Sequence, residues 1–108
     1  MITMTLFTAP KPFNDPLIAT IQNNALEAWS HLVDAEVLVM GAGEGIHRAA
    51  GEHGATHVPD VRTNERGTPL ISSMIQIARE RGRGRLLCIM NADIIVTEDL
   101  VQAALCVN

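Results

Sequence analysis

The sequence has no long hydrophobic run, only two cysteines and no excess of positive charge. No apolar stretch approaches the ~20 residues that a membrane span needs, and no basic segment followed by an apolar block marks a secretory signal. Cys88 and Cys106 make neither a disulfide framework nor a metal motif. The net charge of -4 argues against nucleic acid as a partner. We therefore expect a single domain over residues 1–108, with no membrane span, in the reducing cytoplasm.

Strand-like and helix-like segments alternate along the chain. Strands are expected at 3–8, 35–40, 56–59 and 86–90. Helices are expected at 16–33, at 46–53, from 68–69 to the arginine cluster at 79–85, and from 98 onward. The order βαβαβαβα predicts an α/β fold, a three-layer Rossmann-like parallel sheet of about four strands with helices on both faces. The final helix lacks a terminating signal, so we expect the chain to be the front part of something longer.

Two helices carry apolar residues at helical spacing, and each is expected to bury one face. The first begins at Asp15-Pro16, where Asp caps the helix and Pro occupies its first position. Its predicted buried residues are Leu17, Ile18, Ile21, Ala25, Ala28, Trp29 and Leu32. For the helix that begins at Thr68-Pro69 they are Leu70, Ile71, Met74, Ile75, Ile77 and Ala78.

The apolar run from Leu86 to Met90 predicts a strand that is buried on both faces. It ends at the polar pair Asn91 and Asp93, and ligands in open α/β sheets bind at the carboxyl ends of strands. One carboxylate with a nearby amide could hold a hard divalent ion and leave positions for phosphate oxygens. The alternative is that both side chains only hydrogen-bond the backbone of the turn.

Three other segments are candidates for binding. The loop at 62–68 combines arginines and amides before a helix, which suits an anion, although a solvated surface loop is equally compatible. Lys11 lies between two prolines and faces a phosphate, a base or only solvent. The glycine-rich turn at 41–45 does not fit a dinucleotide-binding fingerprint, because Ile46 occupies the third glycine position. The four histidines show no metal-binding spacing; His47 and His53 are expected on helix surfaces and His57 on a strand.

Several short motifs, in this order and spacing, resemble the N-terminal, nucleotide-sugar-binding half of glycosyltransferases with the A-type fold. The resemblance covers nearly the whole chain and rests on residues 8–13, 21–25, 39–46, 64–69 and 88–95. It implies the strand order 3-2-1-4, which brings Lys11 near Asp93. It also implies a nucleotide-diphosphate sugar as ligand, with transfer of the sugar to an acceptor hydroxyl.

The resemblance also implies roles for individual residues. Thr8, Ala9, Pro10 and the turn from Gly41 to Glu44 would contact the nucleobase, and Asn64 and Arg66 the ribose and diphosphate. The family's Asp-x-Asp signature maps onto Asn91-Ala92-Asp93, so Asp93 becomes the expected ligand of a divalent ion, Mn²⁺ or Mg²⁺. Asn91 replaces the first aspartate of that signature. The acceptor site and catalytic base of the family lie in its second half, so this chain alone is expected to be inactive.

Two other classes of function remain compatible with the sequence. A nucleotidyltransferase-like nucleotide binder has a similar sheet, but its glycine-rich loop with Arg and Lys after the first strand is missing from Ala9-Pro-Lys-Pro12. A non-catalytic α/β domain could instead form a homo-oligomer through an open sheet edge.

Overall fold

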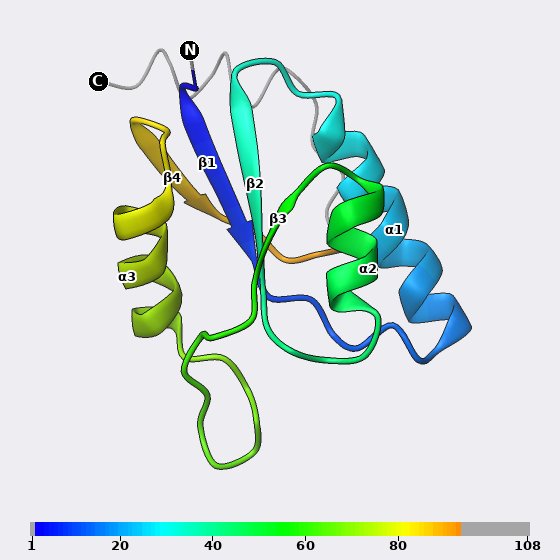
Figure 1. The fold of residues 1–108 in the computed structure, drawn as a ribbon. Helices are drawn as coiled ribbons and strands as arrows, with labels where there is room; N and C mark the ends of the chain where they lie inside the picture. Colours follow the sequence, from blue (N-terminus) through cyan, green and yellow to red (C-terminus); the bar gives the residue numbers. More distant parts are fainter. Residues whose placement is uncertain (1, 94–108) are drawn as a thin grey trace.

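The computed structural model describes residues 2–93, in which parallel strands alternate with helices (Figure 1). The strands pair in the order β3-β2-β1-β4. The elements are β1 (Met4–Thr8), α1 (Pro16–Ser30), β2 (Ala35–Met40), α2 (Ile46–Glu52), β3 (Thr56–Val58), α3 (Ile71–Arg81) and β4 (Leu86–Ile89). The predicted α/β fold and its strand order are confirmed. The helix expected from Glu98 and the second cysteine, Cys106, lie outside the described residues.

Two hydrophobic clusters cover the two faces of the sheet. Met4 and Leu6 of β1 belong to the cluster under α1 and α2, which includes Trp29 with 1% of its surface exposed. Phe7 belongs to the cluster under α3, together with Met74. This division follows from the strand geometry, because successive side chains point to opposite faces. The helices therefore lie on both sides of the sheet, with α3 alone on one side among the described helices (Figure 1).

The central and outer strands differ in burial. All five residues of β1 are buried, since β1 has a strand on each side and helices on both faces. Within residues 2–93, β4 pairs with β1 alone, and its Leu87 and Ile89 side chains are 39% and 47% exposed. The prediction that the run Leu86 to Met90 is buried on both faces is wrong, because α3 packs over β1 and leaves the outer part of β4 uncovered.

Helix α1 begins as predicted and buries Ala25 and Trp29 as expected, but not every residue of the predicted face. Asp15 Oδ1 accepts hydrogen bonds from the backbone N–H groups of Leu17, at 2.9 Å, and Ile18, at 3.2 Å. Leu17 and Ile21, both expected in the core, are 68% and 40% exposed, whereas Gln22 is 4% exposed. The buried face of the helix is therefore rotated away from these two residues.

Helix α3 begins later than predicted and buries fewer residues. Its first residue is Ile71, two positions after Pro69. Met74 and Ala78 are buried as expected, but Ile71 and Ile75 are 62% and 36% exposed. Among the described helices, none has the length and apolar character that crossing a membrane requires.

A buried carboxylate anchors the α3–β4 loop at the amino ends of the strands. Glu36 accepts hydrogen bonds from the Thr5 hydroxyl, at 2.7 Å, and from the backbone N–H and guanidinium of Arg83. Gly84 N donates to Thr5 Oγ1 at 2.9 Å. Burial of Glu36 raises the pKa of its carboxyl, but these hydrogen bonds outweigh that effect and hold the pKa below its ordinary value.

Candidate functional site

A cavity of about 560 Å³ lies at the carboxyl ends of β1 and β4. The loop after β1 contributes Ala9, Pro10 and Lys11, and the loop after β4 contributes Asn91 and Asp93. The remaining lining residues come from α1, from α3, from the end of β4 and from the loop after it: Ile18, Ile21, Gln22, Ile71, Met74, Ile89, Met90 and Ala92. The predicted proximity of Lys11 and Asp93 is thus confirmed, in that both residues line one cavity.

The loop that carries Lys11 is held in place by Gln22 of α1. The Lys11 N–H donates to Gln22 Oε1 at 2.7 Å, and Gln22 Nε2 donates to the Lys11 carbonyl at 2.9 Å. Both backbone groups of Lys11 are therefore paired by one buried amide, while the Lys11 side chain is exposed. This arrangement places an ammonium group on a rigid backbone at the edge of the cavity.

The loop after β4 presents alternate side chains to solvent. Met90 N donates to the Phe7 carbonyl at 3.1 Å, which continues the pairing of β4 with β1 beyond Ile89. In the following residues Ala92 is buried, whereas Asn91 and Asp93 are exposed. The amide and carboxylate oxygens are therefore available to a ligand in the cavity.

These oxygens suit a hard divalent ion that is delivered with a phosphate ligand. Mg²⁺ is commonly held by one or two carboxylates together with phosphate oxygens and water. Residues 2–93 contain no group of three or more His, Cys, Asp or Glu side chains that could hold a metal. An ion at Asp93 would thus take its remaining oxygen ligands from Asn91, water and the bound molecule.

A second cavity, of about 340 Å³, adjoins the first at Pro10, which lines both. Gly41, a predicted nucleobase contact, lines this second cavity, but Glu44 does not. The Glu44 carbonyl instead accepts a 2.7 Å hydrogen bond from Phe13 N, which joins the glycine-rich turn to the loop after β1. The wall opposite this turn comes from the segment between β3 and α3: Pro59, Val61, Thr63, Gly67 and Pro69.

Four predicted site residues, Thr8, Glu44, Asn64 and Arg66, line neither cavity. Asn64 Oδ1 accepts from the backbone N–H groups of Arg66, at 2.8 Å, and Thr68, at 3.0 Å, so this side chain shapes its own loop. Thr8 is fully buried in β1, and its hydroxyl has no hydrogen-bond partner within residues 2–93. Contacts from Thr8, Glu44, Asn64 or Arg66 to a ligand stay predictions.

Sequence reasoning missed Gln22 as a site residue. Its signal was present, because Gln22 lies four residues after Ile18 and three before Ala25, which are both on the predicted apolar face. A polar residue at such a position is buried only with hydrogen-bond partners. The apolar residues of α1 and α3 that line the cavity carried no signal in the sequence that would mark them as part of a site.

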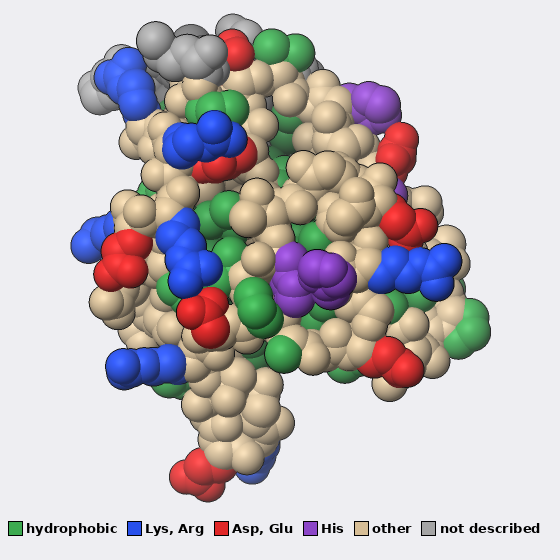
Figure 2. All heavy atoms as spheres, viewed as in Figure 1, with side chains coloured by type: hydrophobic (Ala, Val, Ile, Leu, Met, Phe, Trp, Pro, Cys, Tyr) green, Lys and Arg blue, Asp and Glu red, His purple; other side chains and the backbone are tan. Residues whose placement is uncertain are grey.

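Two histidines that are distant in sequence also lie together. His47 of α2 and His57 of β3 approach within 3.1 Å through their Nδ1 atoms, and histidine side chains gather on the surface over these elements in Figure 2. The sequence predicted His47 on a helix surface and His57 on a strand, but not their contact. Neither spacing nor periodicity relates these two positions.

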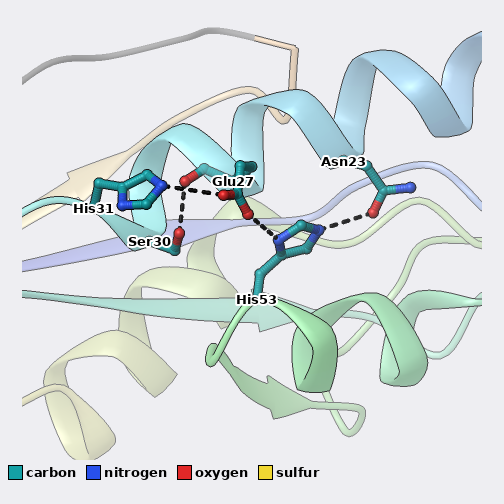
Figure 3. Close-up of polar contacts among 5 residues, drawn as sticks. All are labelled: Asn23, Glu27, Ser30, His31 and His53. Atoms are coloured by element: carbon teal, nitrogen blue, oxygen red, sulfur yellow. Dashed lines mark hydrogen bonds and ion pairs between the residues drawn. The ribbon is translucent and has the colours of Figure 1, made fainter.

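A further polar cluster joins α1 to the end of α2 (Figure 3). Glu27 lies 3.1 Å from His31 Nε2 and 3.2 Å from His53 Nδ1, and His53 Nε2 lies 3.0 Å from Asn23 Oδ1. Hydrogen bonds from His31 and His53 lower the pKa of the Glu27 carboxyl. None of these four residues lines either cavity, so their arrangement holds the two helices together.

Comparisons with protein-family models, with curated proteins and with solved structures found no match to this chain.

Proposed function

We propose that this chain binds a nucleotide-diphosphate sugar at the carboxyl edge of its sheet, as the donor-binding part of a glycosyltransferase with the A-type fold. The observation that supports this most is the cavity between β1 and β4, where Lys11, Asn91 and Asp93 come together. It lies where the strand order reverses, with β2 on one side of β1 and β4 on the other. Ligands of open α/β sheets bind at this kind of position.

The two cavities, which share Pro10 as a lining residue, suit the two parts of such a ligand. The larger cavity offers an ammonium group and oxygen ligands, which suit a diphosphate and its divalent counterion, Mn²⁺ or Mg²⁺. The smaller cavity, lined by prolines and by the backbone of Gly41 and Gly43, suits a flat nucleobase. Pro10 lines both, so the proposal has one nucleotide place its diphosphate and its base on either side of this residue.

Each polar residue has a distinct role in this proposal. Lys11 neutralises part of the diphosphate charge, and Gln22 keeps the Lys11 backbone in position. Asp93 and Asn91 hold the ion, which, when bound, would neutralise the diphosphate as a leaving group. We include a cytoplasmic setting in the proposal, in keeping with the free thiol of Cys88.

Calorimetric titration with UDP and GDP, each with and without Mn²⁺, tests the proposal. We expect binding of one nucleotide that is at least roughly tenfold tighter with the ion, and loss of this gain in Asp93→Ala, since a charge-assisted contact contributes about 1.5–3 kcal/mol. Lys11→Met should weaken binding both with and without the ion.

Glu52→Gln provides the matched control, because this exposed carboxylate on α2 lines neither cavity. It should bind as the wild type does. Absence of binding to either nucleotide, or an Asp93→Ala variant that keeps the full effect of Mn²⁺, would refute the proposal.

A further inference from the structure

The two histidine rings between α2 and β3 have the separation of two ligands of one metal ion. Their Nδ1 atoms lie 3.1 Å apart, with ring centroids 5.1 Å apart and planes inclined by 58°. Two nitrogen atoms that each bind an ion at about 2.1 Å are about 2.9 Å apart at a right angle and about 3.4 Å apart at a tetrahedral angle. The observed separation lies between these values, so an ion could enter with little movement of either ring.

The hydrogen bond on the far side of His57 sets its tautomer for metal binding. His57 Nε2 lies 2.6 Å from the Gly41 carbonyl oxygen, and a ring nitrogen that faces a carbonyl must donate its proton. In a neutral imidazole this leaves Nδ1, which faces His47, with a free lone pair. Metal-binding histidines commonly donate their other N–H to a backbone carbonyl or a carboxylate in this way.

The pair is accessible from solvent. His47 is exposed and His57 is half-buried, and the histidines over α2 and β3 form part of the surface in Figure 2. Since residues 2–93 hold no group of three or more His, Cys, Asp or Glu side chains suited to a metal, the pair would supply two ligands and water the others. Imidazole nitrogen favours zinc, copper and nickel over Mg²⁺ and Mn²⁺.

We propose that His47 and His57 form a surface site for a divalent transition-metal ion of the zinc, cobalt and nickel class. The site is separate from the carboxyl-edge cavity, which neither histidine lines. It therefore does not depend on the proposed binding of a nucleotide sugar, and it selects a different class of ion from Asp93.

The other histidine cluster is less suited to a metal. Both ring nitrogens of His53 already face oxygen atoms, of Glu27 at 3.2 Å and of Asn23 at 3.0 Å (Figure 3). Each ring nitrogen of His53 therefore already has an oxygen partner that an incoming ion would have to displace. This cluster therefore supplies a control within the same chain.

Titration of the purified chain with ZnCl₂ by calorimetry, and with CoCl₂ by visible absorption, tests the site. We expect one saturable site in the wild type, with Zn²⁺ affinity reduced roughly tenfold or more in His47→Gln and in His57→Gln. The cobalt absorption should be lost in both. His47→Gln is the decisive variant because this side chain is exposed and can be replaced without disturbing the core; circular dichroism verifies the fold.

His31→Gln and Asp93→Ala are the controls, and both should bind Zn²⁺ as the wild type does. The proposal is overturned if the wild type shows no saturable binding or if His47→Gln binds normally. It is also overturned if affinity falls only in His31→Gln, which would place the ion at Glu27, or only in Asp93→Ala, which would place it in the carboxyl-edge cavity. Failure of nucleotide binding would leave these results unchanged, so the two proposals can be judged separately.

Discussion

Gln22 shows how one buried polar side chain can define the position of a charged group on another element. Its amide satisfies both backbone groups of Lys11, across eleven positions of sequence. An apolar residue at this place would fill the core equally well but would leave the loop after β1 without this attachment. The orientation of Lys11 therefore depends on a residue that itself carries no charge.

Replacement of Gln22 by Leu should lower the free energy of unfolding by roughly 1–2 kcal/mol, because two hydrogen bonds to the Lys11 backbone are lost. Urea denaturation of wild type and variant measures this change. Asn24→Leu is the matched control, since Asn24 is an exposed position of the same helix. Equal effects of the two substitutions would contradict the role assigned to Gln22.

At the scale of elements, the α3–β4 loop is held against β1 by close backbone contact as well as by Glu36. A Cβ atom at Gly84 would lie 2.5 Å from both Met4 C and Thr5 N. These are backbone atoms of the central strand, which is paired on both sides and cannot easily move. Glycine at this position therefore allows β4 to align beside β1.

We expect Gly84→Ala to destabilise the fold by roughly 1–3 kcal/mol or more, as overpacking against rigid neighbours does. Gly51→Ala should have the opposite effect, a gain of about 0.5–1 kcal/mol, because alanine is favoured over glycine within a helix. Gly51 lies in α2, where an added Cβ meets no atom within 4 Å. Thermal or urea unfolding of both variants checks the contrast; a tolerated Gly84→Ala would count against the packing described for this loop.

The Glu36 anchor predicts a pH dependence of stability. The folded state holds the pKa of this carboxyl below its unfolded value, so the ionised form stabilises the fold above the usual carboxyl pKa of about 4.3. That contribution is lost as the pH falls through the lower, folded pKa.

Comparison of wild type with Glu36→Gln isolates this contribution. The variant should be less stable at pH 7, and the difference should shrink in acid as Glu36 becomes protonated. The free energies of unfolding of wild type and variant, measured from pH 7 into the acid range, test this expectation. A difference in stability that grows toward low pH would contradict the lowered pKa of Glu36.

At the scale of the whole molecule, the strand order decides where a ligand can bind. β1 pairs with β2 on one side and with β4 on the other, so the loops after β1 and β4 meet at one edge of the sheet. Lys11 and Asp93 are 82 positions apart by their numbers, 93 − 11, yet line the same cavity. The site therefore belongs to the sheet as a whole and not to any one segment.

Binding of a nucleotide at this edge should stabilise the whole fold. A ligand that binds only the folded state, at a free concentration a hundred times its Kd, adds about 2.7 kcal/mol to the free energy of unfolding. The thermal midpoint of the wild type should rise with UDP or GDP plus Mn²⁺, and that of Asp93→Ala should rise less. An equal rise in both would show that the nucleotide binds elsewhere.

Prediction from the sequence succeeded for features that depend on neighbouring residues. The start of α1 at Asp15-Pro16, the limits of β2 and the position of Asn91 and Asp93 after β4 all agree with the structure. The prediction failed for exposure, as at Leu17 and Leu87, because burial depends on whether another element covers the residue. Within residues 2–93, β4 pairs with β1 alone, and self-association through its other edge stays a prediction.

Local patterns in the sequence were enough to predict the order of the strands and helices within residues 2–93, since hydrophobic periodicity, caps and turn residues act over a few positions. The resemblance to A-type glycosyltransferases added the strand order, and with it the meeting of Lys11 and Asp93. The contact of Gln22 with the Lys11 loop and the contact of His47 with His57 emerged from the folded structure alone. These contacts join elements whose relative placement is governed by packing of the whole core, which no local pattern of residues encodes.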